Sequence, residues 1–134
     1  MDSEVYFHWH LQNIRSHGHE EAGIKMAMSE VRRHHHTGLN FILTNGSSLY
    51  AYRDAAKGSG HYSLYYLVRD PHPHGPMSVR SQELDALLES KSLNNEKAAL
   101  VCSEKLADEN WSEIPLRRLL IVSGDLAPRM VHVK

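Results

Sequence analysis

The hydrophobic periodicity of this chain changes once, at Gly38, from a helix-like repeat to strand-like runs. Before Gly38, apolar residues recur at spacings of three and four, which is typical of amphipathic helices. After it, short apolar runs are separated by turn residues, which is typical of strands. A chain that starts with helices and continues with strands joined by short turns predicts the α+β class with mostly antiparallel strands.

Two helices are expected in the first part of the chain. The first runs from Asp2 to about residue 16, with Asp2 or Ser3 as its N-cap, and the second runs from about residue 20 to 34. A polar break over residues 16–19 separates them, and Gly38 fits the glycine that follows a helix C-terminus. The expected apolar stripes comprise Val5, Tyr6, Phe7, Trp9, Leu11 and Ile14 in the first helix, and Ile24, Ala27, Met28 and Val31 in the second.

Asn45-Gly46 lies between two strand-like runs, residues 39–44 and 48–53. Both residues tolerate the positive φ of a type I′ turn, so this pair predicts a β-hairpin. A Gly-rich turn over residues 57–60 precedes a third strand over residues 62–69, and the proline-rich segment 70–76 predicts a loop.

The remaining segments predict one short helix and three further strands. Ser81 fits the N-cap of a short helix through about Ser90, with Leu84, Leu87 and Leu88 facing inward. Apolar runs at 98–102 and 119–122 predict strands, and residues 130–133 predict a short edge strand. We therefore expect a single domain over residues 1–134, with two helices packed on a mostly antiparallel sheet of five or six strands.

The composition excludes several classes of protein. The 15 Lys and Arg residues nearly balance the 16 Asp and Glu residues, for a net charge of −1, so no basic surplus predicts a nucleic-acid partner. No apolar stretch approaches the roughly 18 residues of a membrane span, and the acidic start does not resemble a signal peptide. We expect no membrane partner and a cytoplasmic protein.

Eleven histidines are the unusual feature of the composition. Three local clusters, residues 17–19, 34–36 and 72–74, raise the possibility of a metal site. Consecutive and alternate histidines rarely converge on one ion, so their spacing favours surface or helix-capping roles, and no metal or cofactor is expected. His8 and His10 are two residues apart and therefore lie on different faces of the first helix.

Two further residues carry alternatives. Cys102 could be a nucleophile, but its apolar neighbours and strand pattern favour a small buried side chain. Trp111 could form a ligand platform, although an anchor that holds its loop against the core is the simpler interpretation. No residue of the chain is predicted to be catalytic, because no nucleophile with its base is found.

Three stretches together resemble the C-terminal half of the class II glutamine amidotransferase domain, without its N-terminal cysteine segment. They are Asp2-Ser3-Glu4; residues 39–53 with Leu64-Tyr65-Tyr66; and residues 87–91 with 101–106, 111–115 and 119–122. The resemblance implies half of an N-terminal-nucleophile hydrolase sandwich, in which helix, sheet, sheet and helix form the layers. In that family an N-terminal cysteine attacks the glutamine amide, its own amino group acts as base, and ammonia is released.

This chain departs from the family at residue 1, which is methionine, so the resemblance assigns no nucleophile here. One position carries over. The family's Asp-Ser-Glu motif supplies the aspartate that binds the α-amino group of glutamine, and Asp2 occupies that place. Asp2 has an alternative as a helix cap alone.

Two classes of function remain open. The chain is a truncated or split half of a glutaminase, inactive alone, or a non-catalytic module that binds an amino acid or a protein. Loss of half a sandwich exposes an apolar sheet face, which predicts either a homo-oligomer or a separately encoded N-terminal half as partner.

Overall fold

The computed structural model describes residues 2–57, 62–70, 77–81, 86–90 and 96–134. These residues divide into two compact units. The helical unit holds the residues up to Thr37 together with His132–Lys134, and the β unit holds Gly38–Val131. The expectation of a single domain over residues 1–134 remains a prediction.

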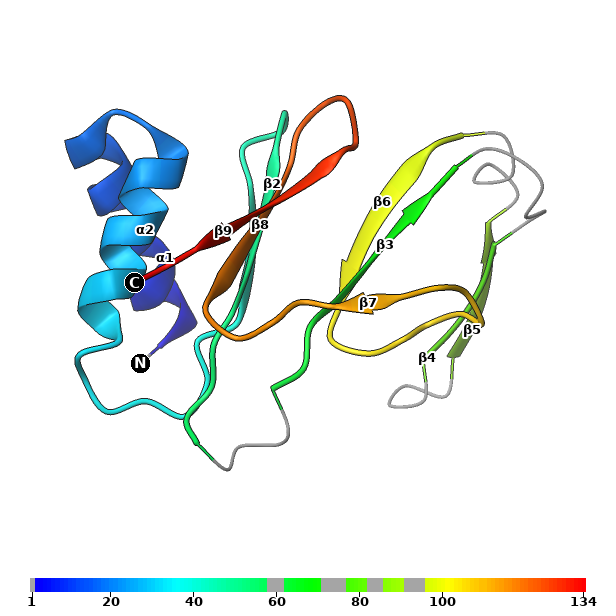
Figure 1. The fold of residues 1–134 in the computed structure, drawn as a ribbon, viewed down its shortest axis with the longest axis horizontal. Helices are drawn as coiled ribbons and strands as arrows, with labels where there is room; N and C mark the ends of the chain where they lie inside the picture. The colour runs from blue at the N-terminus through cyan, green and yellow to red at the C-terminus, as the bar shows by residue number, and fades with distance from the viewer. Residues whose placement is uncertain (1, 58–61, 71–76, 82–85, 91–95) are drawn as a thin grey trace. The chain divides into compact units, whose positions relative to one another are not determined.

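The helical unit contains α1, Ser3–His17, and α2, Glu20–Val31, which lie side by side (Figure 1). Both predicted helices are confirmed, and so is the polar break between them. Gly18 ends α1 with a φ of 66°, and its backbone N–H donates to the carbonyl oxygen of Ile14 at 2.9 Å. A glycine suits this place because side chains rarely adopt that backbone conformation.

The buried face of α2 is the predicted one, because Ile24, Ala27, Met28 and Val31 are all buried. The predicted stripe of α1 is partly wrong. Val5 and Phe7 are 58% and 46% exposed, whereas the polar His10 and Asn13 are buried. The face of α1 that meets α2 follows Tyr6, His10 and Asn13, whose spacings of four and three place them on one side of a helix.

The β unit contains two larger sheets and one separate hairpin. The first sheet has the order β1-β2-β8-β9, and the second has the order β6-β3-β7. The strands of the first sheet are β1 (Phe41–Thr44), β2 (Leu49–Arg53), β8 (Arg118–Val122) and β9 (Pro128–His132). Those of the second are β3 (Tyr65–Arg69), β6 (Ala98–Cys102) and β7 (Ser112–Glu113), and the hairpin joins β4 (Met77–Ser81) to β5 (Ala86–Ser90).

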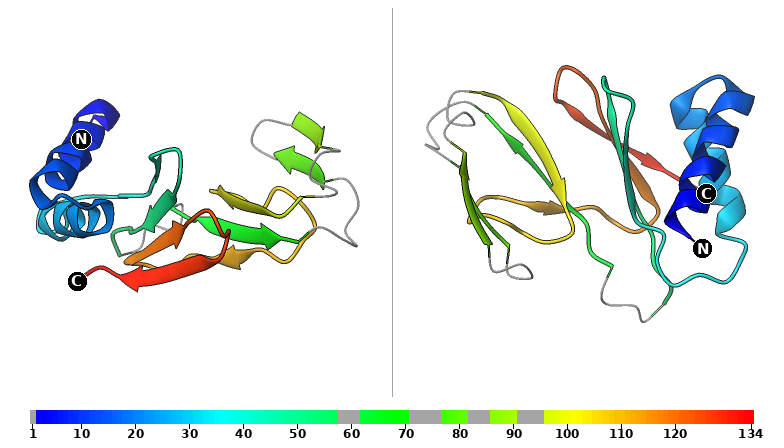
Figure 2. Two further views of the ribbon diagram at one scale, coloured as in Figure 1. Left: turned by 90° about the horizontal axis from the view of Figure 1, so that it is seen from above. Right: turned by 180° about the vertical axis from the view of Figure 1, so that it is seen from behind.

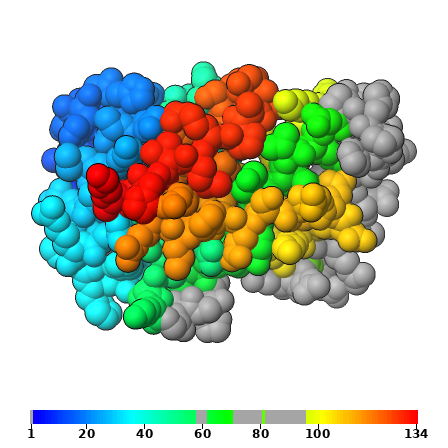
Figure 3. All heavy atoms as spheres, in the orientation of Figure 1, coloured from blue at the N-terminus to red at the C-terminus, as the bar shows by residue number. Residues whose placement is uncertain are grey.

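The predicted α+β class with two helices is confirmed, and every strand pair of known register is antiparallel. The strands are shared among sheets of four, three and two strands and do not form one sheet of five or six. The predicted edge strand near the C-terminus is confirmed, since β9 ends the four-stranded sheet. Its residues are mostly exposed on the face seen in Figure 3, in red.

The hairpin predicted at Asn45-Gly46 joins β1 to β2, with Thr44 opposite Leu49. Its turn is not of type I′, because four residues separate the strands and only Gly46 has a positive φ, 89°. The Asn45 side-chain oxygen Oδ1 accepts hydrogen bonds from the backbone N–H groups of Ser47 and Ser48, at 2.9 and 2.8 Å. Asparagine therefore fixes this turn through its side chain.

Two local predictions are wrong. Gly38 does not follow a helix end, because α2 stops at Val31 and Gly38 forms a β-bridge with Ala55. The predicted helix from Ser81 to Ser90 is replaced by β4 and β5, which pair from Met77↔Ser90 to Ser81↔Ala86. A nine-residue helix is marginal, and the leucine spacing in a run this short does not separate helix from strand.

Figure 2 shows the strands of the two larger sheets from two further sides. These two sheets share an apolar cluster. Its buried residues are Ala51, Leu64, Ile114, Leu120 and Val122. Tyr66 from β3, together with Ala99 and Val101 from β6, packs against them, so side chains of both larger sheets meet in this cluster. The predicted turn at residues 57–60 and the loop at 70–76 fall mostly outside the described residues.

Candidate functional site

Asp2, the residue predicted to bind substrate, is the N-cap of α1. Its φ and ψ of −65° and 141° are extended, and its side-chain oxygen Oδ1 accepts a hydrogen bond from the Glu4 backbone N–H at 2.8 Å. Its carbonyl oxygen accepts from the N–H of Tyr6 at 2.9 Å. The predicted cap is therefore confirmed: the Glu4 N–H holds the carboxylate, and the Tyr6 N–H holds the main-chain carbonyl oxygen.

The capped Asp2 carboxylate can accept further hydrogen bonds. An ionised aspartate has two oxygens with about four lone-pair sites, and the bond to Glu4 uses one of them. The side chain is exposed, so a ligand can reach it. A carboxylate oriented in this way can accept charge-assisted hydrogen bonds from an ammonium group. Helix capping and recognition of an amine are thus compatible at Asp2.

Contacts between α1 and α2 fix the orientation of the helix that presents Asp2. The Tyr6 hydroxyl donates to the Met28 sulfur at 3.1 Å, and the indole N–H of Trp9 donates to the Ala27 carbonyl oxygen at 3.2 Å. Both donors reach a residue of the buried face of α2. They attach the first turns of α1 to its neighbour and so position the capping residue.

The two histidines of α1 lie on different faces of the helix, as their spacing predicted. His8 is exposed and His10 is buried, and burial lowers the pKa of His10 from 6.5 to about 4. His17 hydrogen-bonds the carbonyl oxygen of Asn13 at 2.8 Å, and His19 is the N-cap position of α2. Within the described part of the chain, no three His, Cys, Asp or Glu side chains form a possible metal site; the cluster at 72–74 lies outside it.

Cys102 and Trp111 both pack against apolar residues of the β unit. Cys102 lies in β6 and is partly buried against the cluster of Leu67 and Trp111. Trp111 is only 7% exposed, and its indole N–H donates to the carbonyl oxygen of Ala107 at 3.1 Å. The interpretation of Trp111 as a loop anchor is confirmed, and the Cys102 thiol packs as a small apolar group.

The buried polar groups of the β unit were not anticipated from the sequence. Asp54 is 3% exposed and accepts hydrogen bonds from the Tyr52 hydroxyl at 3.1 Å and from the backbone N–H of Ala55 at 2.9 Å. Arg69 is 2% exposed and pairs with Glu109. These groups have partners inside the fold, so they act in its stability.

No helix among the described residues has the length and apolar character that a membrane span requires.

Comparison with known proteins identifies the family. The model of the class-II glutamine amidotransferases matches residues 1–131. A solved structure, the glutamine aminotransferase class-II domain protein from Silicibacter pomeroyi, matches with a TM-score of 0.59 and 21% identity, over 98% of this chain and 51% of that one. The chain thus spans about half of that protein, whose likeness shows the fold. No curated protein matches the sequence. The resemblance seen in the sequence is confirmed, and the chain belongs to the class II glutamine amidotransferase family.

Proposed function

We propose that this chain supplies the glutamine-binding half of a class II glutamine amidotransferase, which hydrolyses the side-chain amide of glutamine to glutamate and ammonia. The family match over residues 1–131 carries this proposal. The resemblance to the family's Asp-Ser-Glu motif adds Asp2 to the proposal as the ligand of the substrate's α-amino group, and the exposed carboxylate is compatible with that role.

In this proposal the Asp2 carboxylate pairs with the α-ammonium of glutamine. The hydrogen bond from Glu4 N–H to Oδ1 of Asp2 orients the carboxylate before substrate arrives. A pre-oriented partner loses less side-chain entropy on binding than a free one, which favours recognition of a small ligand. The ion pair between Asp2 and the α-ammonium would also distinguish glutamine from an amide that lacks the ammonium.

The nucleophile has to come from the rest of the family's domain. The one cysteine of the sequence, Cys102, is partly buried in a strand. A second copy of this chain repeats the same residues and so adds no other cysteine. We therefore favour an N-terminal half of the domain as the partner, and we expect the chain alone to be inactive. Exposed Val5 and Phe7 on α1 are candidates for the surface that such a partner covers.

The test is release of ammonia from glutamine by the purified chain, alone and mixed with the N-terminal half of a complete class II amidotransferase. Asp2→Asn is the informative variant, because asparagine caps a helix as well as aspartate but has no charge. Loss of a hydrogen bond between charged groups predicts a KM for glutamine raised about tenfold or more. Helix content by circular dichroism should be unchanged.

Each outcome assigns the chain to one class. Activity in the mixture alone, weakened by Asp2→Asn, supports the split enzyme with Asp2 as substrate ligand. Activity that Asp2→Asn leaves intact limits Asp2 to its cap. An inactive mixture, combined with calorimetric binding of glutamine to the chain, would replace the enzyme by a non-catalytic amino-acid-binding module.

A further inference from the structure

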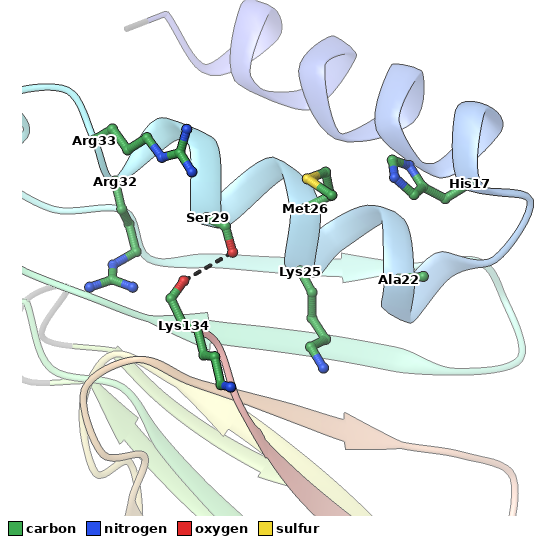
Figure 4. A pocket seen from close by; sticks show the side chains of 8 residues that line it. All are labelled: His17, Ala22, Lys25, Met26, Ser29, Arg32, Arg33 and Lys134. Carbon is green, nitrogen blue, oxygen red and sulfur yellow. Dashed lines mark hydrogen bonds between the residues drawn. The ribbon is translucent and has the colours of Figure 1, made fainter.

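A groove of about 770 Å³ runs along one face of α2, and all its lining residues belong to the helical unit (Figure 4). Five of its side chains are basic: His17, Lys25, Arg32, Arg33 and Lys134. No aspartate or glutamate side chain lines it, although α2 also carries acidic residues. The chain as a whole has a net charge of −1, so this concentration of positive charge is local.

The C-terminal residues contribute to this groove through bonds to α2. The Ser29 hydroxyl donates to the main-chain oxygen of Lys134 at 3.0 Å, and Arg32 Nη1 donates to the carbonyl oxygen of Val133 at 3.4 Å. Figure 4 shows the side chains of Lys25 and Lys134 extending on the same side of α2. Cations distant in the sequence are therefore brought together on one surface.

The groove is extended along the helix. Its residues on α2 and just beyond it, from Ala22 to Arg33, recur at the three- and four-residue spacing of one helix face. From Lys25 to Arg33 the cations on and just beyond α2 span eight residues, about 12 Å at the rise of a helix. A single phosphate group is shorter than this span, whereas an extended chain can run along it. Met26, which is 47% exposed, adds an adaptable apolar contact in the middle.

We propose that this groove binds an extended acidic segment of a partner protein. Charge complementarity selects the segment, and the row of cations aligns it with α2. The contacts are exposed ion pairs, so the complex is of modest affinity and weakens as salt screens the charges. The inference is independent of glutamine hydrolysis and of Asp2.

The test is fluorescence anisotropy with a labelled peptide of ten glutamates and the intact chain. We expect saturable binding at low salt and at least tenfold weaker binding at about 0.3 M salt. The double variant Lys25→Glu with Arg33→Glu should weaken binding at least tenfold. Arg15→Glu is the matched control, because Arg15 is an exposed cation of α1 outside the groove, and it should change the affinity less than twofold.

Three results would overturn the proposal. One is no saturable binding at low salt, and another is an equal loss of affinity in the Arg15→Glu control. The third is tighter binding of inorganic tripolyphosphate than of the peptide, which would assign the groove to a compact phosphate ligand. Circular dichroism of each variant verifies that the helices are intact.

Discussion

Nε of Arg69 donates a hydrogen bond to Oε1 of Glu109 across 2.9 Å, and the arginine side chain is only 1% exposed. The β unit contains a second pair with the same separation, Arg53 with Glu113, whose side chains are 17% and 52% exposed. The two contacts have equal length and differ in their access to water. Because water screens charges, the buried pair should contribute more to stability.

Glu109→Gln should therefore destabilise the protein by about 1–3 kcal/mol, because a nearly buried guanidinium loses its charged acceptor. Urea unfolding of the variant and the wild type gives the difference in the free energy of unfolding. Glu113→Gln is the matched control and should cost less than about 1 kcal/mol, since its carboxylate is half exposed. Equal losses in the two variants would contradict the role assigned to burial.

The buried position of Arg69 could not be predicted from the sequence. Arginine is rarely buried without a partner, and its partner Glu109 lies 40 residues along the chain. No local spacing signals such a pair. Asp54 presents the same difficulty, since its burial depends on how the chain folds back around it.

Elements with strong local signals were predictable. Asn45-Gly46 between two apolar runs predicted the hairpin, and Asp2 before a periodic segment predicted the cap. The prediction of a helix from Ser81 to Ser90 was wrong because the leucine spacing in this segment fits a helix. The strand Ala86–Ser90 forms because it pairs with Met77–Ser81, and the spacing does not reveal that pairing. The candidate site at Asp2 was predictable from a motif, while the basic groove depends on Lys134 folding back onto α2.

The close approach of the two helices gives a second prediction. A Cβ added to Gly23 would lie 2.4 Å from the Cα of Ile14. This Cα is a backbone atom, so it cannot move aside as the end of a flexible side chain can. Gly23→Ala forces the helices apart, so we expect a loss of about 1–3 kcal/mol in the free energy of unfolding, despite the better helix propensity of alanine. Thermal or urea unfolding monitored by circular dichroism measures it.

Gly124→Ala is the control for this substitution. No atom lies within 4 Å of a Cβ built on Gly124, so the change should stay within about 0.5 kcal/mol of wild type. A Gly23→Ala variant as stable as Gly124→Ala would show that α1 and α2 can separate at no cost.

The burial of His10 predicts a pH dependence. Its pKa falls from 6.5 to about 4 because burial disfavours the charged imidazolium, and the ring lies 4.8 Å from that of Tyr6. Between these two values the unfolded chain binds a proton that the folded chain does not. Stability is therefore intact above pH 6.5 and decreases as the pH falls to about 4, by on the order of 3 kcal/mol.

Comparison of wild type with His10→Leu isolates this contribution, since the variant replaces the titrating group with an apolar side chain of similar size. The difference in stability between the two proteins should change between pH 6.5 and 4 and be constant above that range. His8→Leu, at an exposed position of the same helix, should keep the wild-type dependence. Parallel curves for wild type and His10→Leu would contradict a buried neutral His10.

Asp2 allows capping and charge to be separated by two substitutions. Asp2→Ala removes the acceptor for the Glu4 N–H and should cost about 1 kcal/mol in the free energy of unfolding, together with fraying of the first turn of α1. Asp2→Asn keeps an acceptor, so the free energy of unfolding should fall by only a few tenths of the loss in Asp2→Ala. This small loss reflects the missing interaction of a negative charge with the helix N-terminus. Amide hydrogen exchange at Glu4 reports the cap directly. If Asp2→Asn frays the helix as much as Asp2→Ala, the cap depends on charge, and any loss of glutamine binding in Asp2→Asn would then be a structural effect.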